Sequence, residues 1–242
     1  MSEEAERSIL EGETRVLLPL QLPGDVDLSP ALVEVLGRAR VFVLGCYVVP
    51  EQTSPEHARS QFEDDAQASI ERVSAVLESA DIDVETELVF TPDPAHTIDR
   101  VSDNLRIDAL LWVEAVERIE NILTVVSPGV EYDRVVKCLA TVATAGNPAV
   151  ELIEFADNEA DETERDLALD GLVARLEDAG LQAAQLDSES RISTSPREDL
   201  EEMAGDYDLV VLAYTAEMSN RQFIDDVRRR VGAPVLIVRT ES

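Results

Sequence analysis

The amino-acid sequence predicts an α/β protein made of two tandem, doubly wound domains with parallel sheets. The first domain should have four strands and the second five. Two observations carry this prediction. Apolar segments alternate with amphipathic helical segments, and the whole series occurs twice, with the copies roughly 100 residues apart. The apolar segments are apolar at nearly every position, which is typical of parallel strands buried on both faces.

The first copy, residues 13–116, opens with the apolar segment RVLLPLQLPG, which ends in Pro-Gly. Its longest helix is predicted from apolar residues that recur every three or four positions, from Phe62 through Ile70 to Leu77. A proline-containing cap, DPAHTI, begins the following helix. The predicted strands are 15–22, 40–51, 83–90 and 108–114, and the predicted helices are 30–39, 59–80 and 93–106.

The second copy, residues 117–242, repeats this order from NILTVVSPG onward. Gly180 is a natural helix stop, and Ser195-Pro196 is a natural helix start. Only this copy continues, with a helix at 219–232 and the strand APVLIVR at 233–239. The other predicted strands are 121–127, 148–159, 181–192 and 207–214, and the other helices are 130–145, 163–180 and 195–206.

Two apolar strands are expected to need a cover. Strand 108–113 lies at the edge of the shortened first copy, so the linker 114–119, the other copy or a second chain should cover it. Strand 235–238 is apolar at every position and ends the sheet of the second copy. We therefore expect it in an interface, either in a homodimer or between the two copies of one chain.

The charge of the chain is extreme, with 51 Asp and Glu against 20 Lys and Arg and a formal net charge of −31. Lys137 is the single lysine. Two interpretations are open: an acidic surface that binds basic partners, or adaptation to a cytoplasm of multimolar salt. The even spread of the carboxylates favours the second. Hydrophobic residues make up 45% of the chain, enough for a core, and no basic stripe is present to bind nucleic acid.

The sequence contains no long apolar run and begins with a charged segment, which predicts a cytoplasmic protein without membrane insertion. Cys46 and Cys138 belong to no metal-binding motif, and we expect buried free thiols. His57 and His96 stand at helix starts, where surface roles are expected. We predict no metal site, no cofactor and no catalytic residue.

The order of these segments, together with DLVVLAY and the ending APVLIVR, resembles the universal stress protein family in a tandem arrangement of the kind found in halophilic archaea. The resemblance covers about residues 13–242. It implies the adenine nucleotide alpha hydrolase-like fold, with strand order 3-2-1-4-5 in each complete sheet. It also implies a non-enzymatic stress-response or regulatory protein that forms dimers and contacts protein partners, whose identity the sequence does not give.

Members of this family that bind ATP carry a glycine-rich loop after the fourth strand and an Asp near the end of the first. Here Ala213 stands at the first glycine position, and no glycine occurs between Ala213 and Gly232. The sequence therefore predicts that the ATP site has been lost. The alternative is a small-molecule or nucleotide sensor with a remodelled pocket in the second domain. Its candidate residues are Ser127, Pro128, Gly129, Ala213, Tyr214 and Arg221.

Two features of this region leave their roles open. Tyr214 could stack on a ligand ring or fill the vacant space. Arg228, Arg229 and Arg230 could bind an anion, although pairing with Asp225 and Asp226 on the same helix is favoured. The Ser193–Ser195 stretch is expected to cap a helix.

Overall fold

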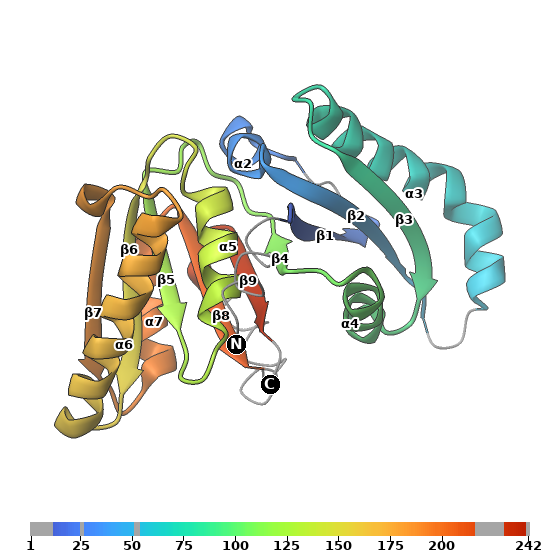
Figure 1. Ribbon diagram of the computed structural model, residues 1–242. Helices are drawn as coiled ribbons and strands as arrows, with labels where there is room; N and C mark the ends of the chain where they lie inside the picture. The colour runs from blue at the N-terminus through green and yellow to red at the C-terminus, as the bar shows by residue number, and fades with distance from the viewer. Residues whose placement is uncertain (1–11, 25–26, 51–53, 216–229, 241–242) are drawn as a thin grey trace.

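The computed structural model describes residues 12–24, 27–50, 54–215 and 230–240. In these ranges the chain forms one nine-stranded sheet in the order β3-β2-β1-β4-β9-β8-β5-β6-β7. Figure 1 shows the two repeats as two lobes, with the first repeat (β1–β4) on the right and the second (β5–β9) on the left. The predicted α/β class with doubly wound, mostly parallel strands is confirmed.

The first repeat has four strands, all paired in parallel in the order β3-β2-β1-β4. Three of its helices begin with a proline in the first turn, where the missing N–H has no intrahelical partner to lose. Its elements are β1 (Thr14–Leu22), α2 (Pro30–Leu36), β2 (Ala39–Val48), α3 (Pro55–Glu78), β3 (Val84–Thr91), α4 (Pro94–Leu105) and β4 (Ala109–Trp112).

The second repeat has the predicted 3-2-1-4-5 order, here β7-β6-β5-β8-β9. Its elements are β5 (Asn121–Val126), α5 (Tyr132–Val142), β6 (Ala149–Ala156), α6 (Glu159–Asp178), η1 (Ala183–Gln185), β7 (Leu186–Ile192), α7 (Pro196–Met203), η2 (Ala204–Asp206), β8 (Leu209–Thr215) and β9 (Val235–Thr240). Most of the helix predicted at 219–232 lies outside the described residues.

One strand boundary differs clearly from the prediction. The strand predicted to start at residue 181 begins at Leu186, because the preceding residues form a short 3-10 turn. Gln182 and Gln185 close that turn reciprocally through their side chains and backbone, and Gln185 also donates to the carbonyls of Ala143 and Pro148. Glutamine gives no turn signal in the sequence, so this local hydrogen bonding was missed.

One antiparallel pair of strands joins the sheets of the two repeats in the described ranges. β4 pairs with β9 over four residues, from Ala109 opposite Val238 to Trp112 opposite Val235. β9 also pairs with β8 in parallel, so it lies inside the sheet with both edges occupied. The apolar edge strand β4 is therefore covered by the other repeat, which was one of the three possibilities left open by the sequence.

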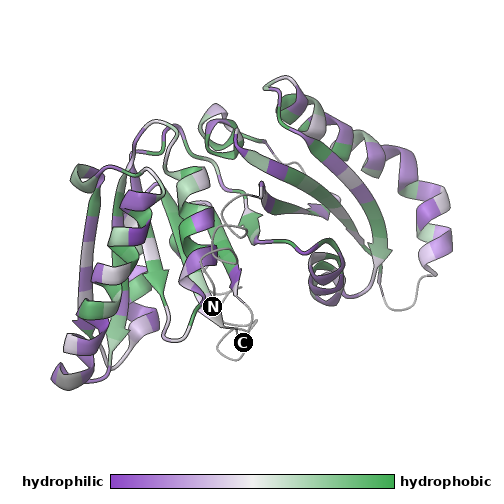
Figure 2. Cartoon of the chain, viewed as in Figure 1, coloured by the Kyte–Doolittle hydropathy of each residue, from purple (hydrophilic) through white to green (hydrophobic). Residues whose placement is uncertain are grey.

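Two apolar layers fill the space between the sheet and its helices. α2, α3, α5 and α6 contribute Leu32, Ile70, Leu139 and Leu172 to one layer. α4 and α7 contribute Ile98, Val101 and Leu200 to the other. Figure 2 shows hydrophobic strands inside the molecule and hydrophilic outer faces on α3 and α6. Cys46 and Cys138 are buried free thiols in these layers, and burial raises their pKa to about 11 and about 12.

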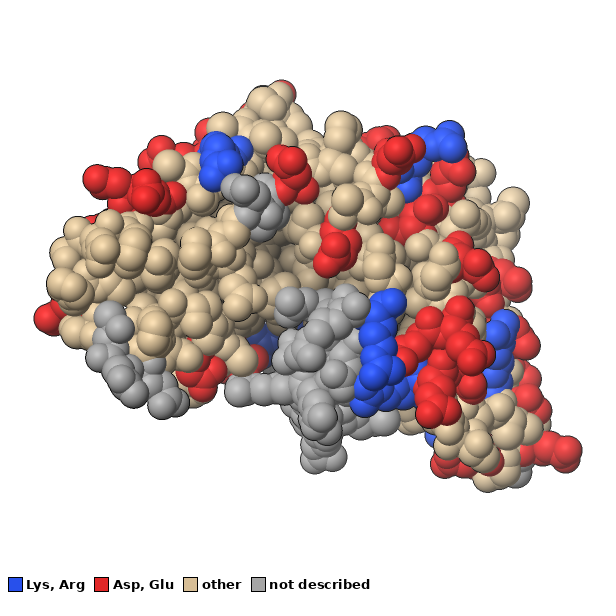
Figure 3. All heavy atoms as spheres, turned by 180° about the vertical axis from the view of Figure 1, so that it is seen from behind, with Lys and Arg blue, Asp and Glu red and all other residues tan. Residues whose placement is uncertain are grey.

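The outer edges of the sheet are polar. β3 exposes Glu85 and Glu87, and β7 exposes Asp187 and Glu189. Charged edge strands disfavour pairing with another chain. The carboxylates on the face seen in Figure 3 are spread over both repeats rather than gathered in one patch.

Candidate functional site

The predicted site lies where β5 and β8 diverge, at the carboxyl ends of the strands of the second repeat. There the backbone N–H of Ser127 donates to the carbonyl of Ala213, at 2.9 Å. Gly129 follows with a φ of +80°, a conformation that favours glycine, and lets the chain turn toward α5. The structure therefore brings Ser127 and Ala213 together. Pro128 and Gly129 form the turn beyond them, and Arg221 lies outside the described residues.

The two β8 residues of the predicted site point into the core. Ala213 is fully buried in the layer that contains α5. Tyr214 is 6% exposed and packs in the opposite layer, with Leu200, Val231 and Ala233. Burial raises the pKa of its phenol well above the usual range. Stacking on a ligand would require the Tyr214 ring to leave this apolar layer.

The helix that faces this edge begins with carboxylates. Glu131 occupies the N-cap of α5 without a side-chain cap, and Asp133 lies in the first turn. Glu131 pairs with Arg134 at 2.9 Å, and Asp133 pairs with Arg175 of α6. A helix N-terminus normally favours anions, but these carboxylates already occupy it and would repel a phosphate.

An ion pair between a buried carboxylate and a partly exposed arginine lies next to this edge. Glu154 of β6 is 1% exposed, and its Oε1 lies 3.2 Å from Nε of Arg165 on α6. Burial raises the Glu154 pKa to about 7, although Arg165 opposes the shift. Burial and the nearby Glu154 also raise the pKa of Tyr132. The predicted site omitted this pair; its signal in the sequence is a single Glu between Ile153 and Phe155 in an apolar strand.

In the first repeat the corresponding edge has a hollow of about 540 Å³, lined by the β1–β2 strand ends and α3. Tyr47 stacks on Phe62 and Phe90, with ring centroids 5.2 and 5.0 Å apart, so aromatic side chains form one wall. Nothing in the sequence distinguished these aromatic residues from ordinary core residues. They come from three separate elements and meet only in the folded chain.

Comparisons with solved structures identify the fold. A universal stress protein from Archaeoglobus fulgidus is similar over 93% of this chain and 98% of its own, with a TM-score of 0.57 and 15% identity. A putative universal stress protein from Pseudomonas aeruginosa is similar over 96% of this chain and 95% of its own, with a TM-score of 0.50 and 13% identity. The chain has the universal stress protein fold.

A third solved structure, the cytoplasmic domain of a prokaryotic cation chloride cotransporter, has the same arrangement. It matches 93% of this chain and 95% of its own, with a TM-score of 0.52 and 8% identity. No protein-family model matches the sequence, and no curated protein matches it either. At these identities the likeness establishes the universal stress protein fold and leaves the function to be argued from the residues.

Within the described ranges this universal stress protein fold carries no group of three or more His, Cys, Asp or Glu residues able to hold a metal ion. His57 and His96 are exposed, and the His96 backbone is capped by Asp93 at 3.0 Å. No helix in the part of the chain that the structure describes has the length and hydropathy needed to cross a membrane.

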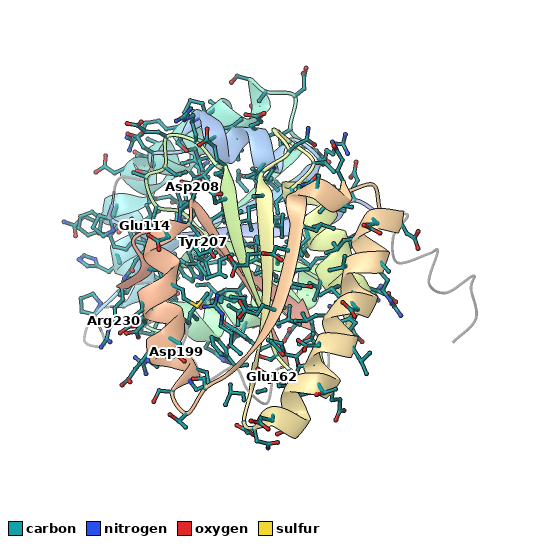
Figure 4. All side chains as sticks on the ribbon, turned by 90° about the vertical axis from the view of Figure 1, so that its left-hand side faces the viewer. Glu114, Glu162, Asp199, Tyr207, Asp208 and Arg230 are labelled. Carbon is teal, nitrogen blue, oxygen red and sulfur yellow. The ribbon has the colours of Figure 1, made fainter. Side chains whose placement is uncertain are left out.

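Further ion pairs belong to the α7 side of the second repeat. Arg230 donates to Glu201 at 2.6 Å, and Arg197 donates to the same carboxylate at 3.1 Å. Both contacts lower the Glu201 pKa. Figure 4 shows Tyr207 and Asp208 at one end of this sheet and Asp199 and Glu162 nearer the other. Of the three consecutive arginines, Arg230 thus makes a structural ion pair, while Arg228 and Arg229 lie outside the described residues.

Proposed function

We propose that this chain is a non-enzymatic regulatory protein of the universal stress protein type that acts through contacts with protein partners and has lost the ATP site. We also propose that it works in the cytoplasm, and that its acidity is an adaptation to high salt. A homodimer remains part of the proposal. Because β9 already pairs on both edges, that dimer would use a surface other than strand 235–238.

One observation carries the loss of the ATP site. The edge where a triphosphate would bind presents buried Ala213 and Tyr214 on one side and the carboxylates Glu131 and Asp133 on the other. Phosphate binding needs several converging N–H donors and close backbone approach. The sequence from Ala213 to Phe223 contains no glycine to permit that approach.

The similarity to the cytoplasmic domain of a cation chloride cotransporter is one of fold, and we propose a role in protein contacts by analogy alone.

Isothermal titration with Mg-ATP in multimolar KCl tests the proposal. We expect no one-to-one isotherm tighter than about 1 mM. An ATP-binding universal stress protein serves as the positive control in the same buffer. Micromolar, one-to-one binding of ATP at the β5–β8 edge would overturn the proposed loss of the site.

A sensor for small molecules is the second candidate, and the hollow in the first repeat favours it. Its aromatic wall of Tyr47 and Phe62 could hold a flat ligand, with Asp65 and Ser69 at the rim. The pocket of this second candidate would lie in the first repeat, whereas the sequence predicts a remodelled pocket in the second. Phe62→Ala should abolish ligand-induced stabilisation if the hollow is used, and a ligand shift unchanged by that substitution would count against it.

A further inference from the structure

A second hollow lies between the two repeats and reaches the N-terminus of α5, where Glu131 lines it. Its volume is about 990 Å³. The first repeat lines it with the start of β1 and the α4–β4 turn, including Arg15, Ser102 and Arg106. The second repeat contributes Arg134 and Lys137 of α5 and Arg239 of β9. Neither repeat alone forms this junction cavity.

The junction cavity gathers the scarce basic residues of the chain. Six of the 20 Lys and Arg residues line it, against four of the 51 Asp and Glu residues. The six are Arg15, Arg40, Arg106, Arg134, Lys137 and Arg239. In a chain with a net charge of −31, this is a local reversal of sign. A wall of cations inside an acidic protein attracts anions from solution.

Some of these charges are already balanced. Lys137 Nζ lies 2.8 Å from Oδ2 of Asp108, and both side chains are 13% exposed. Arg239 pairs with Asp103 at 2.6 Å. By contrast, Arg15 donates from Nη1 to the carbonyl of Leu105, a neutral group. Neither Arg15 nor Arg106 forms an ion pair with a described carboxylate. Among the described residues, these two guanidinium charges are therefore not balanced by a carboxylate.

Three buried polar groups of the cavity walls also lack a hydrogen-bond partner in the described part of the chain. They are the hydroxyl of Ser102, which is 1% exposed, Nη1 of Arg239 and Nε of Arg40, and the last of these lies 3.4 Å from Oδ2 of Asp83. Buried donors without acceptors are costly and rare in folded proteins. A bound anion with several oxygens would supply acceptors for such donors.

We propose that the junction cavity binds a phosphorylated small molecule that carries at least two negative charges and no aromatic base. Guanidinium groups bind phosphate oxygens in a bidentate manner, and the arginines here come from both repeats. No aromatic residue lines the cavity among the described residues, so a base would find no ring to stack on. The ligand would tie the two repeats together. The cavity shares Glu131 and Arg134 with the β5–β8 edge, but its other cations lie outside that edge, and the inference does not rest on the proposed function.

The test is isothermal titration of the full chain with pyrophosphate in multimolar KCl, with inorganic triphosphate, sulfate and ATP as comparisons. We expect pyrophosphate to bind one-to-one with a dissociation constant below about 1 mM. Arg106→Asn should weaken it by about tenfold or more, because a guanidinium without a carboxylate partner is lost. Asparagine suits the left-handed backbone of Arg106, where φ is 51°.

Arg118→Asn is the matched control, since Arg118 is 77% exposed in the linker and lies outside the cavity. Far-UV circular dichroism checks that each variant is folded, and Arg15→Gln gives a second test should Arg106→Asn fail to fold. Absence of pyrophosphate binding up to about 10 mM overturns the proposal, as does equal binding by wild type and Arg106→Asn.

The comparison ligands define the class. Sulfate that binds as tightly as pyrophosphate, or ATP that binds about tenfold tighter than inorganic triphosphate, contradicts the assigned ligand chemistry. Micromolar ATP binding that survives Arg106→Asn contradicts the proposed function instead, because it would lie outside the junction cavity. The two hypotheses can therefore fail separately.

Discussion

Each repeat has an aspartate immediately before its fourth strand, Asp108 in the first and Asp208 in the second, and the two differ in their surroundings. In the second repeat Asp208 accepts hydrogen bonds from the backbone of Glu120 and Asn121, both at 2.9 Å. In the first repeat Asp108 accepts from the backbone of Arg15 at 2.8 Å. Each aspartate also donates its own N–H to the first strand, to the Asn121 or Arg15 carbonyl at 2.9 Å. The repeats thus share a device that fixes the register of strands one and four.

Only Asp108 has a second task. It pairs with Lys137 of the other repeat, and its carbonyl accepts from the backbone of Arg239 at 2.8 Å. Thr14 and Thr141 form a further contact between the repeats, with their hydroxyls 2.6 Å apart. The aspartate before the fourth strand thus fixes register within both repeats, and in the shortened repeat it also joins the two repeats. We therefore infer that the pairing of β4 with β9 fuses the repeats into one cooperative sheet.

The largest effect is expected from breaking the joint itself. Val235→Lys with Ile237→Lys would place two ammonium groups in the middle of the sheet, where both native side chains are at most 3% exposed. Burying unpaired charges costs several kcal/mol each, on the order of the whole stability of a domain. We expect the chain to unfold or aggregate, as measured by circular dichroism and sedimentation in multimolar KCl.

Thr86→Lys with Ser188→Lys is the control, because it adds the same charge to the two polar edge strands. Those residues lie on β3 and β7. The control should remain folded. A soluble chain with unchanged association after the β9 substitutions would break the account, since it would show that β9 is not buried between β8 and β4.

The two aspartates provide the next comparison. Asp108→Asn leaves the Lys137 ammonium without its carboxylate at a site where both groups are 13% exposed. Removing one partner of a buried pair costs about 3–5 kcal/mol, less where water reaches it. Asp208→Asn removes the same charge but keeps an amide oxygen for the backbone donors. We expect the free energy of unfolding to fall by about 2–3 kcal/mol for Asp108→Asn and by about 1 kcal/mol for Asp208→Asn.

Chemical denaturation of both variants in the same salt measures this difference. Equal losses would show that Lys137 does not depend on Asp108, and that the joint between the repeats is weaker than the geometry indicates.

The third comparison is between Gly45 and Glu154, which occupy equivalent positions in the second strands of the two repeats. Gly45 lies four residues after Val41, the partner of Val16, and Glu154 lies four residues after Val150, the partner of Ile122. Glu154 is buried, with a pKa raised from 4.5 to about 7. Because the pKa of Glu154 is higher in the folded than in the unfolded chain, protonated Glu154 contributes to the free energy of unfolding. This contribution is fully present below the unfolded pKa and is lost as pH rises through about 7.

We therefore expect the free energy of unfolding of wild type, relative to Glu154→Gln, to fall between pH 4.5 and 7 by on the order of 2–3 kcal/mol. Denaturation of both proteins across this range tests the prediction. Parallel pH profiles would mean that Glu154 keeps an ordinary pKa in the folded chain.

A smaller effect comes from Gly45 itself. A methyl group there would lie 2.4 Å from Cδ1 of Ile70, a side chain only 1% exposed. Gly45→Ala should therefore destabilise by about 1–3 kcal/mol through overpacking. Gly171→Ala, in α6 with no atom within 4 Å of the added carbon, should stabilise by about 0.5–1 kcal/mol. Shifts of the same sign in thermal melting would contradict the packing described around Gly45.

Much of the fold could be predicted because its signals are local or repeated. Fully apolar strands, prolines at helix starts and the doubled order predicted the α/β class and the 3-2-1-4-5 order of the second repeat. The sequence left open which segment covers the apolar strand β4, because no local pattern specifies which distant apolar strand will pair with it. The structure pairs it with β9. Long-range pairing is decided by the whole fold.

The candidate site was less predictable than the fold. The sequence placed Ser127 and Ala213 together, because both follow neighbouring parallel strands. It could not place the Tyr214 ring, since either face of β8 is apolar and both are covered. The junction cavity escaped notice because its arginines are scattered from residue 15 to residue 239 and converge only through the β4–β9 pairing.

The most direct test of one fused sheet uses Trp112, the single tryptophan, which lies on β4 opposite Val235 of β9. Its fluorescence reports on the joint, while far-UV circular dichroism reports on both repeats. Guanidinium titration in multimolar KCl should give coincident transitions by the two probes, as expected for a single cooperative unit. A fluorescence change that is complete before the loss of circular dichroism would show that the joint opens while the repeats remain folded, and would contradict the account.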